Sequence, residues 1–130
     1  MATVGLRVVV AGWVVAATVA ASCSPGEGPE SILRCVTIMN GHAEEFGGAV
    51  SCSDSSPALD GCVFASNRAI IGGAAGLWNS SSVLTNCEFL GNVVGTPEQW
   101  GPTGGAIWIF ESDPTFTGCT FSGNSAADAG

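Results

Sequence analysis

Carboxylates and basic side chains are the residues of this 130-residue chain that could perform acid–base chemistry. A glycoside hydrolase needs two carboxylates about 5 to 9.5 Å apart. Asp54 and Glu111 occupy equivalent turn positions, but Asn79 holds that position between them, so we expect a separation of about 10 Å. A lyase needs a base that removes a proton, and after residue 22 the chain has only Arg34 and Arg68 and no lysine. We therefore expect no catalytic site.

A metal or cofactor site is not indicated either. The oxygen-bearing turn residues could bind Ca²⁺, although solvated turns use the same residue types. His42 is the only histidine and lies beside Glu44 and Glu45, which favours a surface position. Paired Cys-x-x-Cys elements, which would indicate a tetrahedral zinc site, do not occur. We expect neither a metal nor a cofactor.

Aromatic residues are the candidates for ligand binding. Trp78, Trp108 and Phe110 fall on outward positions of predicted strands, where rings can stack on a sugar or a protein partner. Trp100 lies in the longest insertion, residues 93–103. The insertion could instead fold over the other three rings as a cover, or the aromatic surface could mediate self-association. We predict a binding site at Trp78, Trp108 and Phe110, with Trp100 at its flank.

An internal repeat must position these side chains. Gly-Gly-Ala triplets begin at Gly47, Gly72 and Gly104, and a cysteine follows each first glycine by 15 residues. A phenylalanine comes two residues after that cysteine, and an asparagine three residues later. The resulting columns are Cys62, Cys87 and Cys119; Phe64, Phe89 and Phe121; and Asn67, Asn92 and Asn124. A fixed internal period is the signature of a repeat architecture.

A degenerate first copy precedes the three complete ones. Cys35 is preceded by Ile32 and followed by Asn40 at the spacing of the repeat, with Thr37 in place of the phenylalanine. We expect the asparagine column to serve left-handed turns and a ladder of stacked amides.

The pattern of each repeat predicts short strands rather than helices. The residues after each triplet alternate, with Val50 and Cys52 on one face and Ser51 and Ser53 on the other. The next strand of each repeat carries Leu59, Leu84 or Phe116, three residues before the cysteine. Because three is an odd number of residues, the cysteine would point to the opposite face, so a bend must fall at 60–61, 85–86 and 117–118. Stacked in parallel at about 4.8 Å, such strands make an all-β parallel β-helix, a solenoid of about four coils.

The cysteines are expected to be reduced and buried. Cys35 joins the cysteine column, and Cys52 aligns with Leu77 and Ile109, so all of these positions suit small apolar groups. The alternative is at least one disulfide between neighbouring cysteines, as is common in exported proteins.

A family resemblance follows from two segments, Gly104-Gly105-Ala106-Ile107 and Phe121-Ser122-Gly123-Asn124. Their pairing resembles the repeat of the chlamydial polymorphic outer membrane proteins and of related bacterial right-handed β-helix surface proteins, over about residues 31–130. The resemblance implies a right-handed β-helix and an adhesin-like role at the cell surface. Because the sequence stops six residues after Asn124, where another triplet would begin, we expect a truncated fragment with C-terminal coils missing.

The N-terminus resembles an export signal. The apolar run 8–21 contains one polar side chain and is shorter than the roughly 20 residues of a membrane span. We predict a signal peptide at 1–22, a flexible tether at 23–30 and the repeats at 31–130. The residues before Cys23 are similar to a lipobox, which makes Cys23 a lipid-attachment candidate; plain secretion and an uncleaved anchor are the alternatives. The expected location is secreted, or the outer membrane or cell surface of a bacterium.

Charge and composition narrow the function. A net charge of −8, with 11 acidic residues against three arginines, argues against a nucleic-acid partner. Only 11% of the residues are charged and 19 are glycine, which excludes a solvated disordered chain. We expect an exported, non-catalytic surface module that binds a glycan or a surface protein. The alternatives are a fragment of a carbohydrate-active enzyme of pectate-lyase-like fold and a structural spacer without a ligand.

Overall fold

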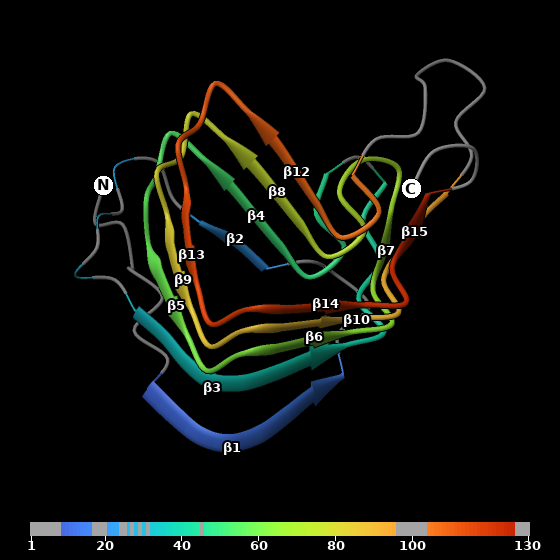
Figure 1. Ribbon diagram of the computed structural model, residues 1–130, viewed down its shortest axis with the longest axis horizontal. Helices are drawn as coiled ribbons and strands as arrows, with labels where there is room; N and C mark the ends of the chain where they lie inside the picture. Colours follow the sequence, from blue (N-terminus) through green and yellow to red (C-terminus); the bar gives the residue numbers. More distant parts are fainter. Residues whose placement is uncertain are drawn as a thin grey trace.

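Parallel β-strands account for every regular element in the described part of the chain. The computed structural model describes residues 9–16, 21–23, 26, 28, 30, 32–44, 46–95 and 104–126. Every strand pair within these residues is parallel (Figure 1). The all-β prediction with parallel strands is therefore confirmed.

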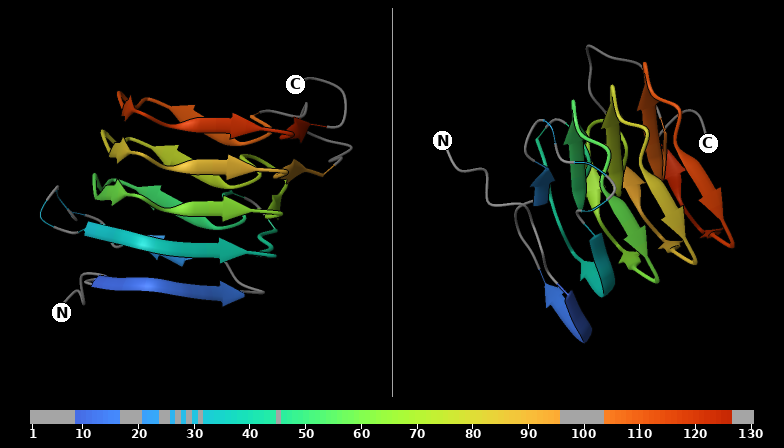
Figure 2. Two further views of the ribbon diagram at one scale, coloured as in Figure 1. Left: turned by 60° about the horizontal axis from the view of Figure 1, so that its bottom comes forward. Right: turned by 90° about the vertical axis from the view of Figure 1, so that its left-hand side faces the viewer.

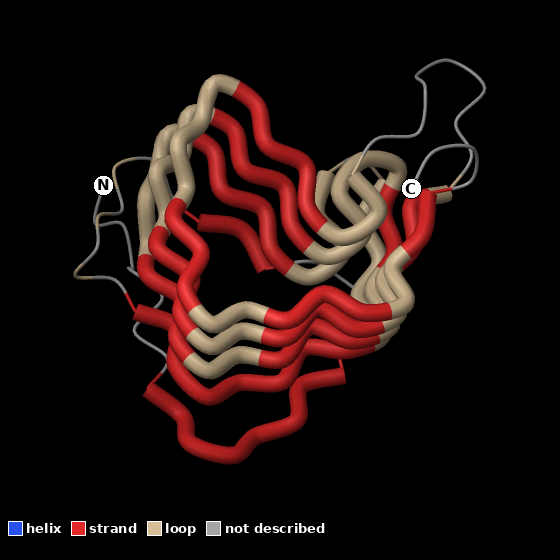
Figure 3. The backbone as a smooth tube through the Cα atoms, viewed as in Figure 1, coloured by secondary structure: helices blue, strands red, loops and turns tan. Residues whose placement is uncertain are grey.

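The described strands form three sheets, and loops connect successive strands within each complete repeat (Figure 3). The largest sheet has the order β13-β9-β5-β3-β6-β10-β14, with β1 paired to β3. Its strands are β1 (Val9–Ala16), β3 (Ile32–Met39), β5 (Ala58–Asp60), β6 (Val63–Ala65), β9 (Val83–Thr85), β10 (Glu88–Leu90), β13 (Thr115–Thr117) and β14 (Thr120–Ser122). The second sheet, β12-β8-β4-β2, contains β2 (Ala21–Cys23), β4 (Val50–Ser53), β8 (Ala75–Trp78) and β12 (Ile107–Phe110). The third, β15-β11-β7, contains β7 (Arg68–Ala69), β11 (Val93–Val94) and β15 (Ser125–Ala126).

Each complete repeat contributes strands to all three sheets, and corresponding strands of successive repeats lie side by side (Figure 2). Phe89 pairs in register with both Phe64 and Phe121. Leu77 pairs in the same way with Cys52 and Ile109. Residues that share a column in the alignment of the three complete copies are thus neighbours in the structure.

The first copy has a different register from the predicted one. Leu33 pairs with Leu59, not Ile32, and the pairing of Thr37 with Val63 places Val36, not Cys35, beside Cys62. The physical reason is burial: Leu33, Val36 and Ile38 have the apolar spacing that the interior requires, and all three are buried. The first copy is therefore shifted by one residue.

Cys35 occupies the bend instead of the interior. It has a φ of 52° and is exposed, and its counterpart in the next repeat is Gly61, with a φ of 63°. Positive φ also occurs at Asn86 and Gly118, so the bends predicted from the parity change are confirmed. A left-handed backbone suits glycine and asparagine better than cysteine.

The Gly-Gly-Ala triplet is explained by three separate constraints. Its first glycine has a positive φ, 65° at Gly72. A Cβ on the second glycine, Gly73, would collide with the carbonyl oxygen of Gly105 in the next repeat. The alanine, Ala74, is completely buried. The first position therefore needs a left-handed backbone, the second needs no side chain, and the third needs a small one.

Gly73→Ala is expected to lower the free energy of unfolding by about 1 to 3 kcal/mol, because neighbouring backbones must separate to admit the methyl group. Gly91→Ala is the comparison variant, because a Cβ there meets no atom within 4 Å. Its φ of 59° leaves only the strain of a left-handed alanine, whereas Gly73 is not left-handed. Urea denaturation of both variants measures the difference. A loss at Gly73 no larger than that at Gly91 would mean that close approach of the neighbouring backbone does not explain the second glycine.

Two columns fill the interior between the sheets. The Phe64 and Phe89 rings are fully buried and stack with centroids 5.0 Å apart. Asn67 and Asn92 are also fully buried, and Asn92 Nδ2 donates to the Phe64 carbonyl at 2.9 Å. Asn67 Nδ2 donates to Asn92 Oδ1 at 3.0 Å, so the amide ladder is confirmed. In the complete repeats the left-handed turn lies one residue before the asparagine, as at Ser66 and Gly91, whereas in the first copy Asn40 itself has a φ of 58°.

The two N-terminal strands lie at least partly within the predicted signal peptide. β1 lies within the predicted signal peptide and pairs with β3, and β2 ends at Cys23 and pairs with β4. The division into signal peptide, tether and repeats stays a prediction. Across the ranges the structure describes, no helix has the length and apolar character needed to cross a membrane.

Candidate functional site: an aromatic groove

The three predicted aromatic residues within the described ranges lie together on β8 and β12. Trp78 pairs in register with Phe110, and Gly76 pairs with Trp108. Since side chains alternate along a strand, all three rings project from the same face of this sheet. Trp78 and Phe110 are each 45% exposed, so both rings remain accessible.

A fourth ring, Phe46, completes the cluster. It precedes Gly47 and forms an isolated parallel bridge with Ile71. A Cβ on Gly76 would lie 3.0 Å from the Phe46 Cβ, so the glycine on β8 leaves room for this ring. Phe46 then contacts Trp108 at a centroid distance of 5.2 Å and Trp78 at 6.4 Å.

Phe46 was not among the predicted site residues. A signal for it was available, because Phe46 stands immediately before a triplet, as Ile71 does in the next repeat. The Phe46 side chain lies beside Gly76 of β8, the strand that follows the next triplet and carries Trp78.

The rings differ in orientation. The rings of Trp108 and Phe110 are stacked and nearly parallel, with 5° between their planes and 5.5 Å between their centroids. Trp78 stands almost perpendicular to them, at 80° to Phe110 and 85° to Trp108. The cluster therefore forms a corner rather than a flat platform.

This corner is part of an open cavity of about 620 Å³, which we call the aromatic groove. It is lined by Glu44, Phe46, Ile70, Ile71, Trp78, Trp108 and Phe110. Among the described residues that line the groove, Glu44 is the only charged one. The chemistry of the groove is thus apolar and aromatic, with a single carboxylate.

The two remaining predicted site residues are Trp100 and Cys23. Trp100 lies outside the described residues, so its flanking position stays a prediction. Cys23 is the last residue of β2, and lipid attachment at this cysteine also stays a prediction.

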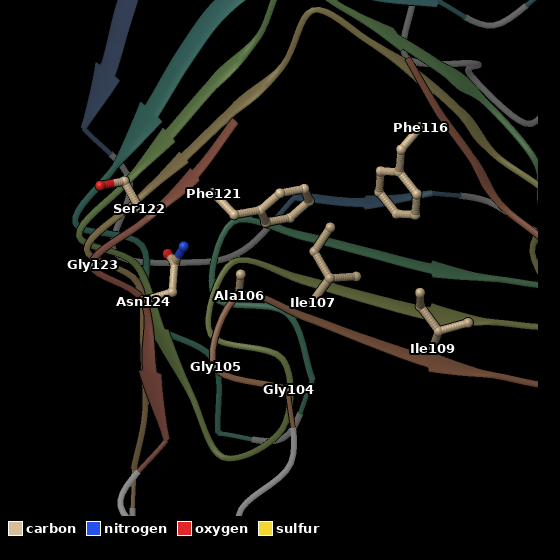
Figure 4. Close-up of a pocket in the computed structure, with 10 residues that line it drawn as sticks. All are labelled: Gly104, Gly105, Ala106, Ile107, Ile109, Phe116, Phe121, Ser122, Gly123 and Asn124. Carbon is tan, nitrogen blue, oxygen red and sulfur yellow. The ribbon is translucent and has the colours of Figure 1, made fainter. Parts of the chain in front are cut away.

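A second cavity, of about 450 Å³, lies at the β12 and β14 edge (Figure 4). The side chains of Ile107, Ile109, Phe116 and Phe121 point toward one another there. Ile109 and Phe121 are 44% and 49% exposed although their counterparts Leu77 and Phe89 are fully buried. Their exposure follows from the edge position of β12 and β14, beyond which no described strand pairs.

Two of the candidates for acid–base chemistry, Arg34 and Asp54, have structural partners. Arg34 Nε donates to Asp60 Oδ2 at 2.9 Å in an exposed ion pair, a kind that stabilises a fold only slightly. Asn79 Nδ2 donates to Asp54 Oδ1 at 2.7 Å, within the turn column that also contains Glu111. No group of three or more potential metal ligands occurs within the ranges given above.

The cysteine column differs in part from the prediction. Cys62 and Cys87 are buried free thiols, as expected, whereas Cys35 is exposed and Cys119 is half-buried. Cys62 Sγ donates to the Leu33 carbonyl at 3.2 Å, and Cys87 Sγ donates to that of Leu59 at 3.5 Å. Cys35 is exposed because of the shifted register, and Cys119 because it lies in the edge repeat.

The thiols of Cys62 and Cys87 influence each other's ionisation. A hydrogen bond from Cys87 can stabilise a Cys62 thiolate, and this lowers the pKa of Cys62 to about 7 against the opposing effect of burial. The same interaction, together with burial, raises the pKa of Cys87. Ionisation of Cys62 does not by itself make it reactive, because no surface of its side chain is exposed.

The cysteines of the native protein should therefore differ in how fast they react with a thiol label. Cys35 is expected to react with maleimide rapidly, and Cys62 and Cys87 only when denaturant opens the fold. Mass spectrometry of proteolytic fragments assigns each modified residue. Rapid native labelling of Cys62, or loss of its free thiol in the unfolded, non-reduced protein, would contradict the buried column.

Comparison with models of protein families, with curated proteins and with solved structures finds no match to this chain.

Proposed function

We propose that this protein is a non-catalytic binding module, adhesin-like and exposed at a bacterial cell surface, and that its aromatic groove contacts the ligand. The observation that carries the proposal is the cluster of four rings, two of which are 45% exposed. Exposed aromatic groups gathered on one face are typical of surfaces that bind sugars or proteins. A glycan or a surface protein is the partner we infer.

The scaffold we propose is a right-handed parallel β-helix of about four coils. The repeated order of strands through the three sheets supports this, as do the in-register phenylalanine and asparagine columns. Connections between parallel strands of one sheet are right-handed in nearly all proteins. A solenoid also explains why the segment between asparagine and the next triplet varies in length while the rest of the repeat does not.

Export and surface attachment belong to the same proposal. The apolar segment before Cys23 supports secretion, and the lipobox-like residues support lipid attachment at Cys23. A lipid there would hold the module at a membrane through its N-terminus, and the resemblance to polymorphic outer membrane proteins favours this arrangement.

Two alternatives explain less of the described structure. An enzyme would need paired acid and base groups, but the side chain of Asp54 bonds to Asn79 and that of Arg34 to Asp60. A spacer without a ligand would not need Trp78 and Phe110 to remain open to solvent beside a groove. We therefore favour the binding module.

Trp78→Ala and Trp108→Ala are each expected to weaken ligand binding about 2- to 12-fold, as expected for loss of 0.5 to 1.5 kcal/mol of ring stacking. A glycan array, followed by a cell-binding assay, measures this effect against the wild type. Phe121→Ala is the matched control, because this exposed ring lies outside the groove. Unchanged binding in both tryptophan variants would remove the aromatic groove from the proposed function.

A further inference from the structure

We propose that the group bound in the aromatic groove is an organic cation of the trimethylammonium type, as in choline. This inference rests on the proposed function and names the chemistry of its ligand. A cation over the face of an aromatic ring is attracted by the ring's electrons when it lies within about 6 Å of the ring centroid.

The arrangement of the rings supports this ligand. Neighbouring centroids in the cluster are 5.2 to 6.4 Å apart. One cation above the corner can therefore lie within reach of more than one ring. Because the planes of Trp78 and Phe110 are nearly perpendicular, a roughly spherical group such as a trimethylammonium can contact both rings at once.

Charge favours a cation over an anion. Glu44 lines the groove, and the whole chain carries a net charge of −8. The two arginines within the described residues do not line it: Arg34 pairs with Asp60, and the Arg68 guanidinium lies close to Gly95. A phosphate or carboxylate ligand would meet a carboxylate without a compensating positive charge.

The lining of the groove also favours binding of a methylated cation over binding of a neutral sugar. Sugar hydroxyls that leave water need hydrogen-bond partners, and an unmade bond costs affinity. The described side chains of the groove are aromatic or aliphatic apart from Glu44, and include no amide or hydroxyl. A trimethylammonium group donates no conventional hydrogen bonds and presents methyl groups to the rings, so this lining satisfies it.

Titration of the full chain with choline chloride, followed by tryptophan fluorescence and calorimetry, tests the proposal. We expect saturable binding, and binding at least about 5-fold weaker for 3,3-dimethyl-1-butanol, which has the same shape without the charge. Sodium chloride at equal concentration controls for ionic strength. Trp78→Ala should weaken choline binding about 2- to 30-fold and Glu44→Gln about 2- to 5-fold, while Phe121→Ala should leave it unchanged.

The outcomes separate this inference from the proposed function. Equal affinity for choline and its neutral analogue would overturn the cation, as would saturable binding that neither Trp78→Ala nor Glu44→Gln weakens. If choline does not bind but Trp78→Ala still weakens a glycan or cell-surface ligand, the cation inference fails and the binding module stands. If neither choline nor any surface ligand binds, both fail. Far-UV circular dichroism checks that each variant is folded.

Discussion

Phe89→Ala is expected to lower the free energy of unfolding by about 3 to 5 kcal/mol. The Phe89 ring is completely buried between two others, with centroids 5.0 Å from Phe64 and 4.8 Å from Phe121. Truncation removes the transfer free energy of the ring and leaves a cavity that paired strands on both sides hold open. Equilibrium unfolding in urea, monitored by circular dichroism, measures the loss.

Phe121→Ala is the matched control for this prediction. It has the same residue type, column and in-register pairing, but its side chain is 49% exposed. Less surface returns to water when it is truncated, so we expect about half the loss or less. Equal losses at Phe89 and Phe121 would show that burial does not distinguish the two repeats in solution.

The strands and columns of the three complete repeats could be predicted because spacing alone determines them. A cysteine 15 residues after the first glycine of each triplet, with a phenylalanine two residues later, leaves one possible register. The first copy was predicted wrongly for the same reason. The prediction aligned Cys35 with Cys62 because both are cysteines. In the fold, the buried residue Val36 takes the position next to Cys62, because burial rather than residue type determines which residue joins the column.

Exposure along a column was not predictable from spacing. Ile109 and Phe121 occupy repeat positions whose earlier members, Leu77 and Phe89, are fully buried. Burial at these positions requires a neighbouring strand on each side. β12 and β14 have a described neighbour on one side only, a property of the sheet order rather than of the repeat itself.

The candidate site was predicted in part for a similar reason. Trp78, Trp108 and Phe110 follow from strand alternation, which is a local pattern. Phe46 and Glu44 precede a different triplet and enter the groove because Gly76 leaves room beneath Phe46. A contact between segments about 30 residues apart needs the paired sheets as well as the period.

Asn92→Ala is expected to lower the free energy of unfolding by about 2 to 6 kcal/mol, because it leaves two buried groups without partners. The Asn92 side chain is fully buried; its Oδ1 accepts from the backbone N–H of Asn67 at 3.0 Å, and its Nδ2 donates to the Phe64 carbonyl at 2.9 Å. Alanine provides neither bond, and each unsatisfied buried group costs about 1 to 3 kcal/mol.

Asn86→Gly provides the control for the asparagine ladder. Asn86 is exposed and has a φ of 50°, and glycine already occupies the corresponding bend at Gly61 and Gly118. The free energy of unfolding should change by no more than about 0.5 kcal/mol there. Urea denaturation of both variants gives the comparison. A loss at Asn92 no larger than that at Asn86 would mean that water replaces the Asn92 amide, and that the interior between the sheets is open to solvent at this column.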